Sequence, residues 1–568
     1  MRAMVWKMLA AAVGVAWAGV AGAQSAGGGC APGLAPERNE ACAQMERQVA
    51  LLISDPAVSR AHWGVVVREM DGTPDGSPVY GLNEVQFFQP ASNTKLFTTA
   101  AAMALLGHEA RFQTRAFAKG TLSGRGRLTG DVVLVGGGEA NLSARELPYV
   151  SPALRPKRTP GAPLAAEPDP LRILVDMADQ VVATGLKVVT GDVVGDDTLF
   201  PWEPYPSDWS IDDAVWGYGA PVSALTVSDN QLRLTIRPGV RPGTAASVEL
   251  QQAVPYYVVR ANVTTAAAKS EAGGVQVKRA PGSRELRIYG AVAADAAADV
   301  EEVAIDDPAE YAAMAFKALL EARGVRVKGR AVAHHRPPVT ARGFLEQRRE
   351  PLPLLDTAAE QARSCRTGPC DGLPTEAPEL LARHVSSPLG EDVVVTNKVS
   401  QNLHAELLLH QLGLAAGQDG TEHGMDDAST AQGARVVRQF LVNAGLDPDD
   451  FVFYDGSGLS GHDLLTPRAT VRLLTWASGQ PWFAAWKASL PVGGEDGTLA
   501  TRFAKEPLKD RLFAKTGTLG EARALSGYLQ GASGRTVAFS VMVTDHAPGG
   551  HADQEVMDRI VEAIAATN

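Results

Sequence analysis

The sequence predicts an α/β (α+β) fold in which an antiparallel sheet is flanked by helices and interrupted by a large β-rich insertion. Segments with helical and strand periodicity frame both ends of the chain, whereas residues 116–384 consist mainly of short alternating runs separated by glycine and proline. At 568 residues the chain is also too long for one compact domain. We therefore predict a discontinuous domain over residues 24–115 and 385–568, with an inserted accessory region that has room for two subdomains.

Residues 1–23 have the pattern of a secretory signal peptide. Arg2 and Lys7 precede an apolar run over residues 8–20, and Ala21-Gly22-Ala23 supplies small residues for cleavage. The apolar run is short for a bilayer span, and we predict no integral membrane segment after signal cleavage. The expected location is periplasmic.

Net charge and cysteine content bear on the expected partners, disulfides and cofactors. The formal net charge of −11 opposes binding to a polyanion, so no nucleic acid partner is expected. Cys30 and Cys42 are close in sequence, as are Cys365 and Cys370, and two local disulfides would suit an oxidising compartment. Because no cysteine or histidine spacing indicates metal ligands, we predict neither a metal nor a cofactor.

The first part of the predicted sheet precedes a buried helix. Residues 63–70 contain a run of valines that predicts a strand, and a second extended stretch is expected to reach Gln89, where Pro90 ends it. Residues 92–106 are apolar at helical spacing and nearly all round, which predicts a buried helix. A serine in its first turn would lie where the helix dipole favours developing negative charge.

The later elements follow from the same periodicities. The insertion contains five candidate strands, at residues 132–135, 188–194, 232–236, 275–278 and 286–289, and a candidate helix at 307–322. In the last third we predict helices at 402–412, 430–445 and 551–566, and an antiparallel pair of strands at 524–529 and 537–544.

Three motifs occur in order along the chain and together indicate an active-site serine enzyme. They are Ser92-Asn93-Thr94-Lys95, Ser400-Gln401-Asn402 and Lys515-Thr516-Gly517-Thr518. Each arises easily by chance, so the information lies in their combination and their settings. Ser228-Asp229-Asn230 has the pattern of the second motif, but it lies in a strand-like run of the insertion, whereas Ser400 stands directly before a helix.

These residue types fit nucleophilic acyl transfer. Serine needs a base, and Lys95 lies about one helical turn from Ser92 on the same face. Burial and the neighbouring cation Lys515 would lower the pKa of the Lys95 amine enough for it to act as that base. Ser400 would relay a proton to the leaving amine, and Asn402 would hold the substrate backbone.

The third motif predicts a substrate-binding strand edge. Lys515 and Thr516 can bind a free carboxylate, and Gly517 would let the substrate backbone approach closely. The backbone amides of Ser92 and Thr518 are candidates for an oxyanion hole. Aromatic residues of the insertion could form a further substrate wall or pack its interior, and the sequence leaves both open: Trp202, Tyr205, Trp209, Trp216 and Tyr218.

With these motifs the chain resembles the low-molecular-mass class C penicillin-binding proteins, a family of D-Ala-D-Ala carboxypeptidases and DD-endopeptidases. The resemblance spans nearly the whole mature chain, and other similar segments are Pro90-Ala91-Ser92, 131–143, 217–225, Thr396-Asn397, 455–460 and 494–499. It implies a penicillin-binding, transpeptidase-like serine hydrolase domain, with Ser92 acylated and Lys95 as its base. It also implies peptidoglycan stem peptides as substrates and β-lactam antibiotics as covalent inhibitors.

The resemblance further implies an acidic residue in the insertion that binds the free amine of the peptide side chain. The similar segment is residues 195–200, in which Asp197 is the first choice and Asp196 the second. Two features depart from the family pattern: Gln401 at the middle of the second motif, and Pro-rich loops such as 151–170 that enlarge the insertion. Those loops could alter substrate access, which bears on endopeptidase more than on carboxypeptidase activity.

Other classes of protein stay open. A β-lactamase or an esterase could use the same Ser-x-x-Lys machinery, although neither needs an insertion of this size. Rapid turnover of penicillin would identify such an enzyme. A non-catalytic peptidoglycan-binding protein is another alternative, against which the complete set of catalytic residue types argues.

Overall fold

The computed structural model describes residues 28–73, 76–143, 145–151, 169–270, 273–338, 344–347, 349, 379–416 and 428–568. The predicted signal peptide, most of the 151–170 loop and the pair Cys365 and Cys370 lie outside these residues. Among the helices that are described, none combines the length and apolar character needed to cross a bilayer.

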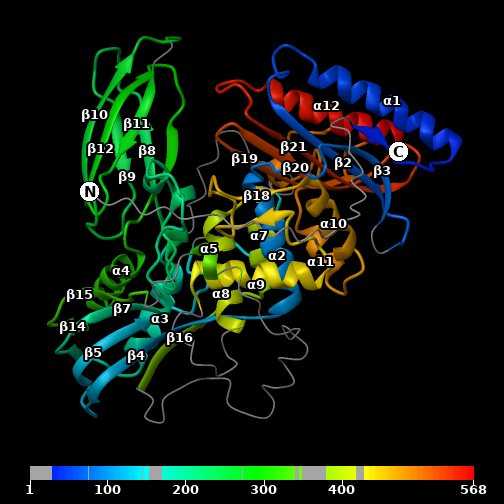
Figure 1. Ribbon diagram of the computed structural model, residues 1–568. Coiled ribbons are helices and arrows are strands. Elements are labelled where there is room, and N and C mark those ends of the chain that lie inside the picture. The colour runs from blue at the N-terminus through cyan, green and yellow to red at the C-terminus, as the bar shows by residue number, and fades with distance from the viewer. Residues whose placement is uncertain are drawn as a thin grey trace, which may run out of the picture.

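Both ends of the chain build one six-stranded sheet with the strand order β1-β3-β2-β21-β20-β19 (Figure 1). Its strands are β1 (Gly29–Cys30), β2 (His62–Glu69), β3 (Ser77–Leu82), β19 (Leu512–Leu519), β20 (Ala522–Gln530) and β21 (Thr536–Thr544). All neighbours are antiparallel, which confirms the predicted sheet. The second extended stretch is shorter than predicted, because Asn83 adopts a left-handed backbone with a φ of 49° and starts a turn.

Helices cover both faces of this sheet. Side chains alternate along β2, so Val65 and Val67 pack in one core and Val66 in another. The first core contains α1 (Pro36–Ile53) and α12 (Ala552–Thr567), which lie together above the sheet in Figure 1. The second contains α2 (Thr94–Leu105) and α10 (Pro467–Ala477).

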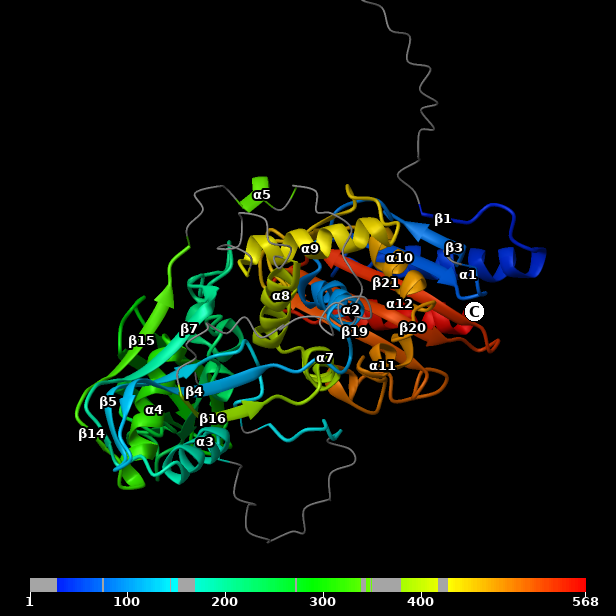
Figure 2. The same ribbon diagram turned by 90° about the horizontal axis from the view of Figure 1, so that it is seen from below.

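Further helices surround α2 on the same side of the sheet (Figure 2). They are α7 (Leu389–Lys398), α8 (Asn402–Ala416), α9 (Thr430–Asn443) and α11 (Phe483–Ala488), with a small ladder of β17 (Phe451–Val452) and β18 (Leu464–Leu465) nearby. The helices at α2, α8, α9 and α12 were predicted, whereas α1, α7, α10 and α11 were not. As a result α2 is buried on almost every side.

The region between α2 and α7 is β-rich, as predicted. Its largest sheet has seven strands: β4 (Gln113–Leu122), β5 (Arg127–Val135), β6 (Val188–Val189), β7 (Val193–Pro201), β14 (Arg326–Val327), β15 (Ala331–Arg336) and β16 (Glu379–Val385). Two helices pack on it, α3 (Arg172–Ala183) and α4 (Pro308–Ala322). Helix α4 was predicted, and the Asp307 side chain caps it by accepting a hydrogen bond from the Glu310 amide.

Two smaller sheets complete this region. One contains β8 (Gln231–Arg237), β9 (Ser247–Leu250) and β13 (Asp299–Ala304), and the other β10 (Val258–Ala266), β11 (Gly274–Lys278) and β12 (Glu285–Ala293). A short helix, α5 (Phe344–Gln347), lies near α9. The domain boundaries at residues 115/116 and 384/385 stay a prediction.

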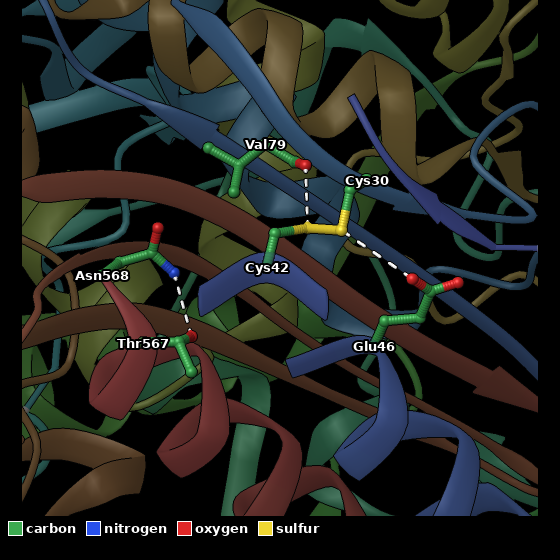
Figure 3. The surroundings of a disulfide bond; sticks show 6 residues. All are labelled: Cys30, Cys42, Glu46, Val79, Thr567 and Asn568. Atoms are coloured by element: carbon green, nitrogen blue, oxygen red, sulfur yellow. Dashed lines mark hydrogen bonds between the residues drawn. A yellow bond between two sulfur atoms is a disulfide. The ribbon is translucent and has the colours of Figure 1, made fainter. Parts of the chain in front are cut away.

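A disulfide joins Cys30 to Cys42, as the sequence predicted (Figure 3). It links β1 to α1, and the Cys42 sulfur lies 3.3 Å from the carbonyl oxygen of Val79 on β3. The bond therefore fastens the first helix to the edge of the six-stranded sheet.

Close packing of α4 on β7 yields a test of the fold. A Cβ atom on Gly195 would lie 2.1 Å from the carbonyl oxygen of Ala309, so Gly195→Ala must displace the start of α4. We expect a loss of about 1–3 kcal/mol, seen as a lower melting temperature. Gly124→Ala is the matched control, because nothing lies within 4 Å of its Cβ position. Equal melting temperatures for the two variants would contradict this packing.

Candidate active site

Ser92 lies in a 3-10 turn, Ala91–Asn93, directly before α2. The sequence predicted that it belongs to the helix itself, but Ala91 has a left-handed backbone with a φ of 47°, which separates the turn from the preceding chain. Ser92 is partly exposed, whereas both of its neighbours are buried. Its hydroxyl can therefore meet a substrate while its backbone is held from both sides.

Two glycines allow other segments to approach this turn closely. A Cβ atom on Gly517 of β19 would lie 2.6 Å from the Pro90 carbonyl oxygen, and one on Gly458 would lie 1.8 Å from that of Ala91. The Asn93 side chain also donates a hydrogen bond of 3.1 Å to the carbonyl of Lys515. Gly517 thus makes room for the turn that carries the serine. The sequence predicted that this glycine admits the substrate backbone, but its Cβ position points at Pro90 and not at open space.

The amine of Lys95 is the centre of the site. Its Nζ lies 2.9 Å from Ser92 Oγ, 2.6 Å from Asn402 Oδ1 and 2.7 Å from the Ser457 carbonyl oxygen. The side chain is completely buried. Burial lowers the pKa of Lys95 to about 8, although nearby carboxylates oppose this shift. Near that pH a large share of the amine is neutral and can accept a proton from Ser92.

Three carboxyl groups lie buried around Lys95, on Glu406, Asp455 and Asp463. Burial raises the pKa of Glu406 to about 8 and raises that of Asp463 well above its usual range, and the charge of Asp455 adds to both shifts. Because buried like charges repel, the three groups cannot all be ionised cheaply. Their summed charge partly offsets the loss of water around the lysine.

Asp455 also shapes the loop that faces Lys95. Its carboxylate accepts backbone N–H groups from Ser457, Gly458, Leu459 and Ser460, at 2.6–3.1 Å. These bonds fix the loop in which the carbonyl of Ser457 points at the lysine.

The second motif bridges the two lysines. Ser400 has a left-handed backbone with a φ of 61°, and its Oγ accepts a hydrogen bond of 2.9 Å from Lys515 Nζ. Asn402 accepts from Lys95 and donates to the carbonyl of Tyr218 at 2.8 Å. Burial, and secondarily the charge of Lys95, lower the pKa of Lys515 well below its ordinary value. The structure therefore brings the predicted catalytic residues together, including their most distant member in the sequence.

The edge strand β19 carries the rest of the third motif. Thr516 is partly exposed and its hydroxyl lies 2.7 Å from that of Thr498, while Thr518 is exposed. Beside the second motif is a hollow of about 510 Å³, lined among others by Trp216, Tyr218 and Ser400. Two of the aromatic residues that the sequence left unassigned thus border the site.

The structure does not bring Asp197 and Asp196 to this hollow. Asp197 is 2% exposed, and its oxygens are occupied by Ser223 at 2.9 Å and His335 at 2.9 Å. Asp196 accepts from the backbone and hydroxyl of Thr198. Both side chains serve the packing of β7, so their arrangement gives no support to the predicted role in binding a substrate amine.

Sequence reasoning missed a segment of the insertion, residues 209–218, that contacts the site. The hydroxyl of Tyr218 donates a 2.8 Å hydrogen bond to Asp213, and the carbonyl of the same tyrosine accepts from Asn402. Burial raises the pKa of Asp213. A third residue of this segment, Trp209, donates to Asp455 at 2.9 Å. The acidic and aromatic residues at 209–218 indicate a binding surface in the sequence, but no local pattern predicts that this segment contacts Asn402.

Sequence reasoning also missed the role of the rejected motif Ser228-Asp229-Asn230. These residues form a 3-10 turn before β8 with φ values of 53°, 53° and 55°, and not a strand. The buried Asp229 carboxylate accepts from Gln401 at 3.3 Å and pairs with Arg145 at 2.6 Å. Burial alone would raise its pKa, but Arg145 and His404 hold it below the usual range. The insertion thereby contacts the second motif through a hydrogen bond from Gln401 to Asp229.

Comparisons with known proteins agree with this geometry. The sequence matches the D-Ala-D-Ala carboxypeptidase 3 (S13) family over residues 45–358 and 371–567. A D-alanyl-D-alanine carboxypeptidase from an Actinomadura species is 32% identical over 548 residues, which cover 94% of this chain and 87% of that protein. D-alanyl-D-alanine carboxypeptidase DacB from Haemophilus influenzae is 21% identical over 470 residues, which cover 82% of each chain.

The fold matches as well. The crystal structure of penicillin binding protein 4 (dacB) from Haemophilus influenzae superposes with a TM-score of 0.70 at 20% identity, covering 90% of this chain and 98% of that one. The class is that of the serine-type D-Ala-D-Ala carboxypeptidases. The chain belongs to the D-Ala-D-Ala carboxypeptidase 3 (S13) family, and so to the low-molecular-mass class C penicillin-binding proteins that the motifs resembled.

The contact between Gln401 and Asp229 can be tested by a substitution that introduces a charge. Gln401→Glu would place two carboxylates face to face, and we expect kcat/KM to fall about tenfold from the repulsion. Adding Asp229→Asn should restore much of the activity, because the exchanged amide again supplies a donor. Gln401→Leu, which removes the bond without adding charge, is the control. If the Glu variant matched the Leu variant, or the second substitution gave no rescue, the contact would not position the motif.

Proposed function

We propose that this enzyme is exported and hydrolyses the D-Ala-D-Ala bond of peptidoglycan stem peptides, and cross-links between them, through an acyl-Ser92 intermediate. One observation carries the proposal: the amine of Lys95, withdrawn from water, lies 2.9 Å from the hydroxyl of Ser92. Export is supported by the pattern of residues 1–23 and by the Cys30–Cys42 disulfide, which suits an oxidising compartment.

In the acylation step, Ser92 Oγ attacks the carbonyl carbon of the penultimate D-Ala while Lys95 Nζ takes the hydroxyl proton. The carbonyl oxygen becomes an oxyanion that the backbone amides of Ser92 and Thr518 would stabilise. The C–N bond then breaks, and the proton that Lys95 took passes through the hydroxyl of Ser400 to the leaving amine, which leaves Lys95 neutral for the next step. Lys515 donates to that hydroxyl at 2.9 Å, which orients it for the transfer.

In the deacylation step, water attacks the ester with Lys95 as base, the C–O bond breaks, and the proton returns to Ser92. For a free stem the leaving group is D-Ala, and for a cross-link it is the side-chain amine of the neighbouring stem. The same acyl step therefore serves both reactions. A β-lactam would acylate Ser92 in the same way. Ring opening leaves its amine attached to the acyl group, so no part of the inhibitor departs from the site.

The terminal carboxylate and the side-chain amine of the stem peptide would each meet a group of opposite charge. Lys515 and Thr516 would bind the terminal carboxylate on the β19 edge, as the motif predicts. At the other end Tyr218 borders the hollow beside Asn402, and its hydroxyl is bonded to Asp213, whereas Asp197 is buried and already paired with Ser223 and His335. We assign the amine to Asp213 for that reason.

The acyl-enzyme can be observed directly. Incubation with benzylpenicillin should add one penicilloyl mass to the intact protein, and Ser92→Ala should abolish both this adduct and hydrolysis of a D-Ala-D-Ala peptide. Ser54→Ala, an exposed serine at the end of α1, is the control and should label normally. An adduct in the Ser92 variant would overturn the assignment, and rapid release of penicilloate would identify a β-lactamase instead.

The pKa of Lys95 predicts the pH dependence. Only the neutral amine accepts a proton, so kcat/KM should rise with pH and level off above a midpoint of about 8. Glu406→Gln removes a group that is partly ionised near that pH and whose charge raises the pKa of Lys95, so the midpoint should move to lower pH. A midpoint that stays fixed or moves upward in this variant would contradict the electrostatic account of the base.

A further inference from the structure

The outer face of the sheet β10-β12-β11 carries a row of cations. Arg260 on β10 is in register with Arg287 on β12, which is in register with Lys278 on β11. Residues that neighbour them along the strands, such as Ile288 and Val277, are buried on the opposite face. Because facing residues of adjacent strands point to the same side, the three cations line up across the sheet over about 10 Å.

The row is exposed and carries excess positive charge. Side-chain exposures are 68% for Arg260, 74% for Arg287 and 50% for Lys278. Glu285 contacts both arginines through their Nε atoms, at 3.6 and 2.8 Å, and a guanidinium has five N–H donors. Most donors of this row therefore point beyond the one carboxylate that the arginines share. Three cations against the carboxylates of Glu285 and Asp212 leave this face with a net positive charge on a chain whose net charge is −11, which favours anions there.

The next row of residues on the same face is uncharged and consists of one aromatic and two amide side chains. Tyr289, which is 45% exposed, stands in register between Asn262 on β10 and Gln276 on β11. An aromatic ring with an amide on each side offers one apolar surface and several donors and acceptors. That combination fits the apolar face and the hydroxyl and acetamido groups of a sugar.

A chain of contacts links the cationic row to the active site. Lys278 pairs with Asp212 at 3.2 Å, and Arg279 donates to the carbonyl of Ala214 at 2.8 Å. Asp213, between these two contacts, holds the hydroxyl of Tyr218, whose carbonyl meets Asn402. A continuous path of contacts therefore leads from the second catalytic motif to the outer face of this sheet. Figure 1 shows the sheet at upper left, away from α1 and α12.

We propose that this face, defined by Arg260, Arg287, Lys278 and Tyr289, binds peptidoglycan through the carboxylates of its stem peptides and the sugars of its glycan strand, while another stem peptide of the same polymer occupies the Ser92 site. This rests on the proposed function, since the occupant must reach both places. The cations would meet the carboxylates of the polymer, and the Tyr289 row would meet its sugars. An anionic membrane is the less favoured partner, because it would not also occupy the Ser92 site.

The test separates polymer binding from catalysis. In a Ser92→Ala chain, which leaves the polymer intact, Arg260→Gln with Arg287→Gln should weaken pelleting with purified insoluble peptidoglycan about three- to tenfold. Tyr289→Ala should weaken it independently, and raising the salt concentration should weaken only the charge-dependent part. The control pair Arg125→Gln and Lys187→Gln removes two exposed cations from the β4–β5 side and should bind like the parent.

With Ser92 restored, the double arginine variant should still hydrolyse a short soluble D-Ala-D-Ala peptide and form the penicillin adduct at unchanged rates. If the unsubstituted enzyme lacked both activities, the proposed function would fail, whatever the binding result. If it had them but the arginine variant and the control pair bound peptidoglycan equally, the docking face would be refuted. Arginine-dependent binding to phosphatidylglycerol vesicles without binding to peptidoglycan would also refute it.

Discussion

A lysine amine enclosed by protein is the constraint on which the rest of the site depends. An ammonium ion removed from water must either find compensating oxygen atoms or give up its proton. Around Lys95 both occur: the Ser457 carbonyl and Asn402 accept hydrogen bonds from it, while burial brings its pKa to about 8. The surrounding carboxyls keep that pKa from falling further. This balance leaves an amine that is partly neutral near pH 8 beside the hydroxyl of Ser92.

The insertion is a structural partner of this site and not an appendage to it. Trp209 bonds the carboxylate of Asp455, which shapes the loop that faces the lysine. The carbonyl of Tyr218 receives the Asn402 amide, and Asp229 receives that of Gln401. These three hydrogen bonds join the β-rich region to Asp455 near Lys95 and to the second motif. Changes in the insertion would therefore reach the chemistry through identifiable contacts.

Local periodicity predicted much of the fold. The valine run of β2 and the apolar spacing of α8 and α12 were sufficient, because each pattern reports one buried face. Helix α1 was missed although its buried residues Cys42, Met45, Val49 and Leu52 recur at helical spacing, because the rest of the segment is strongly polar. Helix α7 was missed because its three consecutive valines favour a strand, and packing against α2 overrides that propensity.

By itself the sequence predicted the chemistry: a nucleophile, a base one turn away, and two later motifs with the donors that acyl transfer needs. It could do so because those residue types and short spacings are local properties of the chain. Only the tertiary structure decided how the candidate carboxylates are partnered, burying Asp197 against His335 and placing Asp213 on the hydroxyl of Tyr218. That choice depends on how distant strands pack, and no local pattern encodes it.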